Sequence, residues 1–187
     1  MESTPPTDRD IDVLCVGRQQ PQKRYDRLIE AVGVLRNRGH ELRVALAGDG
    51  AEREALLALV EKLGLENQVE LLGRRSDVFQ LYARSKVFAL TSEREGHPLA
   101  LLEAMSRGCV PVALDCRTGP REIIRSDVDG VLLRRDASVA EIAQGIERVL
   151  TDDDRRSEMS LAAVEGMERF STEAVDVKWK RLLAGVL

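Results

Sequence analysis

Leu90-Thr-Ser-Glu-Arg-Glu-Gly-His-Pro-Leu-Ala-Leu-Leu-Glu-Ala-Met105 is the segment that decides the fold. It ends an apolar strand, turns through Gly96 and Pro98, and enters a helix that is apolar on nearly every side. Proline at the start and Gly108 after the end predict a helix of about 10 residues. A helix without a solvent face is buried, so its one carboxylate, Glu103, needs a polar partner.

Two carboxylates flank the start of this helix. Glu103 lies roughly 7.5 Å along the helix axis from Pro98, and Glu95 lies before it. The unpaired N–H groups of the first turn lie between them and suit a phosphate. The carboxylates could act in acid–base catalysis, bind a metal or bind hydroxyl groups. With only His40 and His97 in the chain, a metal site is disfavoured. Binding of sugar and ribose diols fits best, because ionised carboxylates accept hydrogen bonds.

Working outward, short Val-rich runs alternate with helical periodicities, which is typical of repeated βα units and a parallel sheet. We therefore predict an α/β fold, a doubly wound Rossmann-like domain whose six-stranded sheet has the order 3-2-1-4-5-6 and helices on both faces. The strands are expected at 12–16, 42–47, 69–72, 87–90, 110–114 and 130–133. Short helices are expected at 77–84, 98–107 and 119–125, and the chain after the last strand should be helical to its end.

This strand order brings the loops after strands 1 and 4, at 17–23 and 91–98, to the crevice where ligands bind. Arg18 and Lys23 in the first loop could clamp a diphosphate, or could be solvated charges. Gly48-Asp-Gly50 lacks the third glycine of a dinucleotide fingerprint and indicates a tight turn. The loop from Gly73 could meet a nucleobase, with Ser76 or Asp77 capping the next helix. Gly119-Pro at a helix start is either simple chain geometry or part of the site.

Bulk properties narrow the class of protein. A chain of 187 residues, 43% of them apolar, suits one domain. A net charge of −4 gives no basic field, which disfavours nucleic-acid partners. Three cysteines without disulfide or metal spacing favour the cytosol. No apolar run approaches the ~18 residues of a membrane span. Residues 1–10 indicate a linker or a cloning boundary, and are not typical of a signal peptide.

Several motifs in order resemble a known family. They are the Glu95-x7-Glu103 pair, the stretch 16–31 containing Arg18 and Lys23, Ala47-Gly-Asp-Gly50, Leu72-Gly73, Ser92, and Asp115-Cys-Arg-Thr-Gly-Pro-Arg-Glu-Ile-Ile124. From about Val13 onward the chain resembles the C-terminal, donor-binding half of retaining GT-B glycosyltransferases of family 4, which includes enzymes of polysaccharide biosynthesis. Two positions differ, because Arg24 stands where the family often has glycine and His97 where it often has an aromatic residue.

The resemblance implies a role for each matching position. Arg18 and Lys23 would hold the donor diphosphate, Glu95 would contact the transferred sugar, and Glu103 would hold the ribose diol. Glu95, Arg18 and Lys23 form the implied catalytic set, with neither a metal nor a cofactor. The form of the 115–124 motif favours a UDP-sugar and leaves GDP open. The other implied substrate-binding residues are Gly73, Arg74 and Arg75 at the base, with Ser92, Gly96, His97, Pro98, Leu99, Ala100 and Gly119 near the phosphates and sugar.

The resemblance also implies that half of the enzyme lies elsewhere. Residues 11–187 would form the nucleotide-sugar-binding domain, and a final helix at about 171–185 would pack toward an absent N-terminal, acceptor-binding domain, in cis or in trans. The isolated chain would then bind a donor without transferring it. The expected location is the cytoplasm, with membrane association only through the missing half. Two alternatives stay open, namely a non-catalytic module that docks on a separate acceptor-domain protein and a domain whose site has decayed.

Overall fold

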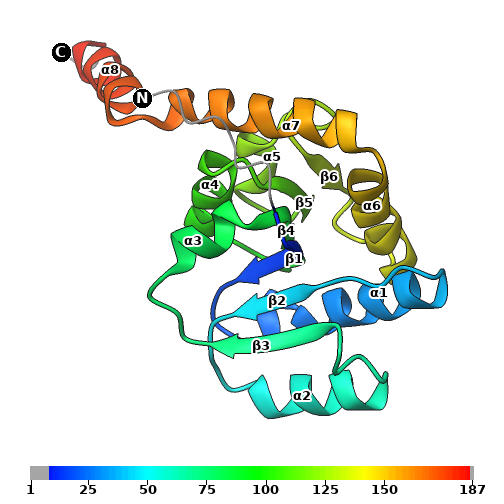
Figure 1. Cartoon of the computed structure of the whole chain (residues 1–187). Coiled ribbons are helices and arrows are strands. Elements are labelled where there is room, and N and C mark those ends of the chain that lie inside the picture. Colours follow the sequence, from blue (N-terminus) through cyan, green and yellow to red (C-terminus); the bar gives the residue numbers. More distant parts are fainter. Residues whose placement is uncertain (1–8, 186–187) are drawn as a thin grey trace.

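The computed structural model describes residues 9–185, which form one parallel sheet wrapped by helices (Figure 1). The strand order is β3-β2-β1-β4-β5-β6, so the predicted topology is confirmed. Every pairing between neighbouring strands is parallel. The strands are β1 Ile11–Val16, β2 Val44–Ala47, β3 Val69–Gly73, β4 Ser85–Leu90, β5 Val110–Leu114 and β6 Val131–Leu133.

Helices cover both faces of the sheet because successive strand residues point to opposite sides. In β1, Val13 and Cys15 enter the core on one face, and Leu14 enters the core on the other. The helices of the first face are α1 Tyr25–Asn37, α2 Arg53–Lys62 and α6 Val139–Thr151. Those of the second are α3 Val78–Ala83 and α4 Leu99–Ser106, and α7 Asp153–Gly166 contributes Met159 to the first core and Ala163 to the second. Figure 1 shows the two layers on either side of the strands.

Several predicted boundaries were wrong by a few residues. Strand β2 begins at Val44 instead of residue 42, and β4 begins earlier than predicted, at Ser85. Helix α5 is only Pro120–Ile123, and short 3-10 helices, η1 Pro21–Lys23 and η2 Met167–Phe170, precede α1 and α8. Apolar periodicity places an element, but hydrogen bonding at its ends sets its limits, which sequence patterns record poorly.

The prediction that helix α4 has no solvent face was wrong at its start. The helix has eight residues, and Leu99 at its first position is 62% exposed. Leu101, Ala104 and Met105 are completely buried, so the apolar pattern marks the core face correctly. Leu99 therefore lies at the end of the sheet where the loop 91–98 opens to solvent.

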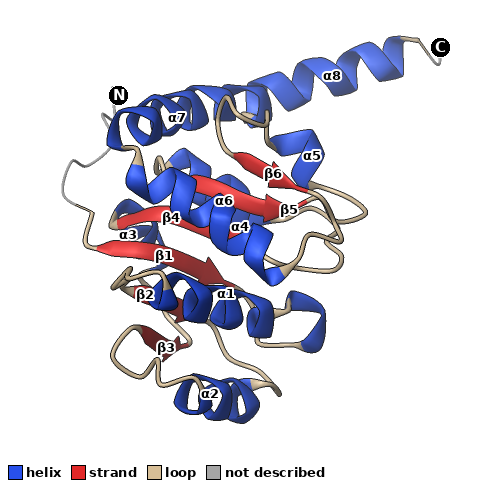
Figure 2. Cartoon of the chain, turned by 90° about the vertical axis from the view of Figure 1, so that its right-hand side faces the viewer, coloured by secondary structure: helices blue, strands red, loops and turns tan. Residues whose placement is uncertain are grey.

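The last helix, α8 Thr172–Ala184, projects from the domain (Figure 2). Its N-cap is Ser171, whose hydroxyl accepts a hydrogen bond from the Ala174 N–H at 3.1 Å. No residue of α8 is buried, and Trp179, Leu182 and Leu183 are each between 58% and 59% exposed. In Figure 2 the helix extends toward the same side as the strand arrowheads.

The segment before β1 is held to the domain where it is described. Arg9 donates a hydrogen bond to the Arg107 carbonyl at 2.7 Å, and Asp10 pairs with Arg84 at 2.5 Å. Residues 1–8, most of the expected linker, lie outside the described residues. The three cysteines are buried free thiols, and burial raises the pKa of Cys15 to about 12. No helix within residues 9–185 is long and apolar enough to cross a bilayer.

Candidate functional site

The loops that follow β1, β2 and β3 are joined by backbone hydrogen bonds at the carboxyl end of the sheet. These bonds run from Gly17 N to Ala47 O (3.0 Å), Gln19 N to Asp49 O (2.9 Å), Glu52 N to Gln19 O (3.0 Å) and Gly48 N to Gly73 O (2.8 Å). Because backbone donors and acceptors satisfy each other, the three loops form a fixed frame for the side chains they carry.

Gly48 and Gly50 make this frame possible. A Cβ atom on Gly48 would lie 1.8 Å from the Gly17 carbonyl oxygen, and one on Gly50 would lie 2.2 Å from that of Gln19. Gly48 also has a φ of +136°, which side-chain-bearing residues rarely adopt. The Gly-x-Gly motif was interpreted as a tight turn within one loop, but its glycines are needed for contact between two loops.

A cleft of about 580 Å³ lies over this frame. Its lining includes Arg18 from the loop after β1, Asp49 from the loop after β2, and Arg74 and Arg75 from the loop after β3. Three of the residues assigned to donor binding therefore line one cleft, and Gly73, with a φ of +66°, precedes two of them. The cleft is large enough for a nucleoside-sized ligand.

The expected side-chain cap of α3 is absent at Asp77. This residue occupies the N-cap position, but its side chain makes no cap hydrogen bond. Instead its carboxylate accepts two hydrogen bonds from the Arg75 guanidinium, at 2.8 and 2.6 Å, which lower the pKa of Asp77. The charge of Arg75 is thus partly neutralised, whereas Arg74 has no ion-pair partner in the part of the chain that the structure describes.

Lys23 and Glu95 form an ion pair across the crevice between the loops after β1 and β4. The Lys23 Nζ lies 2.7 Å from Glu95 Oε1, and the two side chains are only 18% and 9% exposed. The Glu95 carbonyl also accepts a hydrogen bond from Thr118 Oγ1, in the loop after β5. Two residues 72 positions apart are therefore held in one partly desolvated pair.

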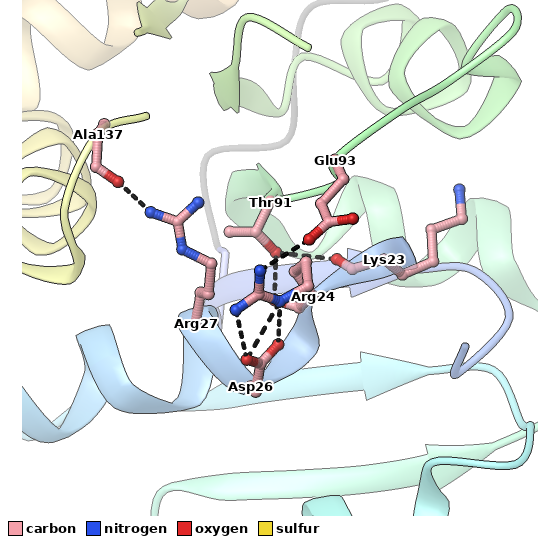
Figure 3. A network of polar contacts seen from close by, with 7 residues as sticks. All are labelled: Lys23, Arg24, Asp26, Arg27, Thr91, Glu93 and Ala137. Carbon is pink, nitrogen blue, oxygen red and sulfur yellow. Dashed lines mark hydrogen bonds and ion pairs between the residues drawn. The ribbon is translucent and has the colours of Figure 1, made fainter. Parts of the chain in front are cut away.

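Next to this pair, Arg24 joins the same two loops (Figure 3). Its guanidinium contacts Asp26 at 2.9 Å and Glu93 at 2.9 Å. The Thr91 hydroxyl donates a hydrogen bond to the Arg24 carbonyl at 2.9 Å. Arg24 has a φ of +50°, in the left-handed region. The glycine that the family often has here would adopt this conformation without strain.

The start of α4 offers fewer free donors than expected. The Leu99 N–H donates to His97 O at 2.9 Å, and the Leu101 N–H donates to Pro98 O at 3.0 Å. Of the N–H groups in the first turn of α4, all within the described residues, that of Ala100 has no backbone acceptor. Gly96 and His97 are exposed in the preceding loop. The first turn of α4 itself therefore leaves one N–H without a backbone acceptor, where the sequence predicted several.

Gly119 lies against the start of α4. A Cβ atom at Gly119 would lie 2.5 Å from Pro98 Cδ, and its φ is +99°. The structure therefore brings this predicted site residue to the edge of the crevice and gives it a packing role there. Ser92, also predicted, is 1% exposed, and its hydroxyl has no hydrogen-bond partner among the residues described.

Glu103 has the polar partner that its apolar helix requires. The Tyr82 hydroxyl of α3 donates a hydrogen bond to Glu103 Oε2 at 3.1 Å. Burial, together with the nearby carboxylate, raises the pKa of Tyr82 far above its ordinary value, so the phenol stays protonated as a donor. Edge-on contacts with Phe79 and Phe88, at 6.0 Å between ring centroids, fix the Tyr82 ring.

A model of the family described as Glycosyl transferases group 1 matches residues 1–165. The chain belongs to this family. The group 1 domain is 31% identical over 171 residues to the amylovoran biosynthesis glycosyltransferase AmsD of Erwinia amylovora, covering 91% of this chain and 47% of AmsD. It is 27% identical to the poly(ribitol-phosphate) alpha-N-acetylglucosaminyltransferase of Staphylococcus aureus, covering 89% of this chain and 34% of that enzyme.

Solved structures show the same fold. The group 1 domain superposes on S. aureus TarM, in a complex that contains UDP, with a TM-score of 0.89 and 26% identity, covering 96% of this chain and 37% of TarM. It also superposes on the Anabaena protein HepE in complex with UDP. The TM-score is 0.83 and the identity 26%, and the match covers 94% of this chain and 49% of HepE. The chain thus spans about half or less of the length of these relatives.

Sequence patterns missed several residues that lie around the candidate site residues. The Tyr82 hydroxyl donates to the Glu103 side chain, and the Thr118 hydroxyl donates to the Glu95 carbonyl. The partners are distant in sequence, so no local sequence pattern predicts these contacts. Arg94, which no sequence motif singled out, is exposed and lines a second cleft beside Arg18. Within residues 9–185, no group of three His, Cys, Asp or Glu residues is arranged to hold a metal ion.

Proposed function

We propose that this chain is the donor-binding domain of a retaining glycosyltransferase that uses a UDP-sugar. The observation that carries the proposal is the Lys23–Glu95 ion pair at the crevice. Lys23 belongs to the same loop after β1 as Arg18, which lines the cleft with Arg74 and Arg75. The pair supplies a cation for phosphate and a carboxylate for sugar hydroxyls within 2.7 Å of each other. UDP complexes of two solved relatives support the choice of base.

In this proposal the nucleoside occupies the 580 Å³ cleft and the diphosphate crosses Arg18 toward Lys23. Negative charge develops on the diphosphate as the sugar departs. Lys23, held by Glu95, and the Ala100 N–H of the helix backbone are in place before binding and can stabilise that charge with little reorganisation, and Arg18 adds its charge from the exposed edge of the cleft. Glu95 orients the sugar through its hydroxyl groups. The acceptor and the second domain come from outside this chain, and the full enzyme acts in the cytoplasm.

Calorimetric titration of the chain with UDP, GDP and ADP, with and without Mg²⁺, tests the proposal. We expect binding of UDP alone, unchanged by Mg²⁺, and a further gain for one UDP-sugar among the glucose, galactose and N-acetylated forms. If none of the nucleotides binds, the donor-domain proposal is wrong for the isolated chain, and a non-catalytic docking module becomes the better hypothesis.

Tyr82→Phe should weaken the binding of the ribose by Glu103. The substitution removes the donor to Glu103 Oε2 and keeps the ring. We expect about a tenfold loss of UDP affinity, typical of a hydrogen bond to a charged group, and a much smaller loss for 2′-deoxy-UDP. The measurement is the ratio of the two affinities in wild type and variant.

Tyr25→Phe is the matched control, because the Tyr25 hydroxyl is also buried and donates to the Gly17 carbonyl at 2.9 Å. This variant should change the affinities for UDP and 2′-deoxy-UDP by the same factor. An unchanged ratio in Tyr82→Phe would show that Tyr82 supports the core and not the ribose site.

We also propose that α8 packs toward an acceptor-binding domain. Trp179 is the one tryptophan of the chain, so its fluorescence reports on this helix alone. The chain of 187 residues should show the red-shifted emission of an exposed indole. Addition of a matching N-terminal domain in trans should shift that emission to the blue. A blue-shifted spectrum before addition would contradict the exposure of α8, and no change on addition would contradict the docking.

A further inference from the structure

A second cleft, of about 420 Å³, lies between the loops after β1 and β4. It is lined by Arg18, Gln20, Pro21, Gln22 and Arg94. Two guanidinium groups and two amide groups supply hydrogen-bond donors, and no carboxylate belongs to the lining. This composition suits an anion and does not suit a cation or an apolar group.

The two arginines of this cleft are not neutralised by the protein. Among the residues that the structure describes, neither Arg18 nor Arg94 has an ion-pair partner, whereas Lys23 and Arg24 beside them pair with Glu95 and Glu93. Each arginine therefore keeps its full positive charge beside the cleft, where a bound anion gains favourable Coulomb energy.

The position of Arg94 is set by the backbone next to it. The Glu93 N–H donates to the Gln22 carbonyl at 2.9 Å, and the Glu93 side chain pairs with Arg24 at 2.9 Å (Figure 3). These contacts hold the two loops side by side and place the residue after Glu93 against the 20–22 turn. The left-handed conformation of Arg24 is part of this arrangement. The backbone on both sides of the cleft is therefore held by contacts between the two loops.

Arg18 lines both clefts, so it lies between them. The nucleoside cleft, on one side, contains Arg74 and Arg75, and the second cleft, on the other, contains Arg94. We propose that Arg94, with Gln20 and Gln22, binds a phosphate group of the second substrate, the acceptor, next to the donor diphosphate. This inference rests on the proposed function. It adds that the donor domain itself recognises a phosphorylated acceptor.

The chemistry matches the ligand. A guanidinium donates two parallel hydrogen bonds to phosphate oxygens, and neutral amide donors complete the shell. The donor diphosphate already uses Arg18, so Arg94 is the arginine that remains for another anion. The phosphate can belong to a water-soluble glycan or to a lipid headgroup, and both present the same oxygens to the cleft.

The test is titration of the UDP-saturated chain with inorganic phosphate, followed by NMR of backbone amides in the 20–22 turn. We expect saturable binding that does not displace UDP. Arg94→Gln should weaken phosphate binding about tenfold and leave UDP affinity unchanged, whereas Arg18→Gln should weaken both. Glycerol 3-phosphate and vesicles of phosphatidylglycerol, each compared in wild type and Arg94→Gln, then distinguish a soluble source of the phosphate from a lipid source.

Arg117→Gln is the control, because Arg117 is an exposed arginine of the loop after β5 that does not line the cleft and has no ion-pair partner within the described part of the chain. It should leave phosphate binding unchanged. Competition between phosphate and UDP, or equal losses in Arg94→Gln and Arg117→Gln, would overturn the inference even if UDP binds. Absence of UDP binding would instead refute the proposed function on which it rests.

Discussion

Gly48→Ala is expected to destabilise the domain by more than about 4 kcal/mol, which is a large part of the stability of an ordinary domain. The new Cβ would lie 1.8 Å from the Gly17 carbonyl oxygen, and both atoms are fixed by the backbone. Relief requires the loops after β1 and β2 to separate, which breaks the hydrogen bonds between them. The measurement is the free energy of unfolding from urea denaturation.

Gly39→Ala is the control for this clash. Gly39 also has a left-handed φ, +91°, but nothing lies within 4 Å of its Cβ position. Its substitution should cost only the backbone strain, about 1–2 kcal/mol. If the two variants unfold at nearly the same urea concentration, the contact between the loops is not what requires Gly48.

Lys23→Ala should weaken UDP binding by roughly 10- to 100-fold, the range for losing a hydrogen bond between charged groups. Glu95→Gln should not weaken UDP binding, because it releases Lys23 from its 2.7 Å ion pair. The same variant should bind a UDP-sugar no better than UDP, because it loses the carboxylate that accepts from the sugar. Calorimetry with UDP and the UDP-sugar on wild type and both variants measures these affinities.

The Lys86–Asp12 pair offers a matched control. It has the same 2.7 Å separation and lies at the amino ends of β4 and β1, away from the crevice. Lys86→Ala should leave both affinities unchanged. Equal UDP affinities in wild type, Lys23→Ala and Glu95→Gln would remove Lys23 from the binding site.

The sheet was predictable because its strands are buried on both faces and therefore read as continuous apolar runs. The strand order was taken from the common arrangement of doubly wound sheets, and it brings the loops containing Lys23 and Glu95 together. Contacts made by single hydroxyl or backbone groups could not be predicted from the sequence. Examples are the hydrogen bonds from Tyr82 to Glu103 and from the Leu99 N–H to His97 O. These depend on side-chain direction and helix-end geometry, which no spacing rule records.

Helix α4 shows one correct and one wrong prediction. Its apolar residues predicted a buried helix, and Leu101, Ala104 and Met105 are buried. Its first turn was expected to offer several donors to a phosphate, yet tight turns around Pro98 use most of them. The roles of Glu95, Glu103 and the other residues assigned by resemblance stay predictions until binding is measured.

The backbone frame beneath the ligand edge has a consequence for how such domains diversify. Its hydrogen bonds join main-chain atoms of the loops after β1, β2 and β3, so they depend on few side chains, chiefly the glycines, the buried Gln19 and Asp49. Positions such as Arg18 and Arg74, whose side chains make no such contact, can be exchanged during evolution without disturbing the loops that present them. Selection can therefore alter what this edge recognises while the architecture underneath is inherited intact.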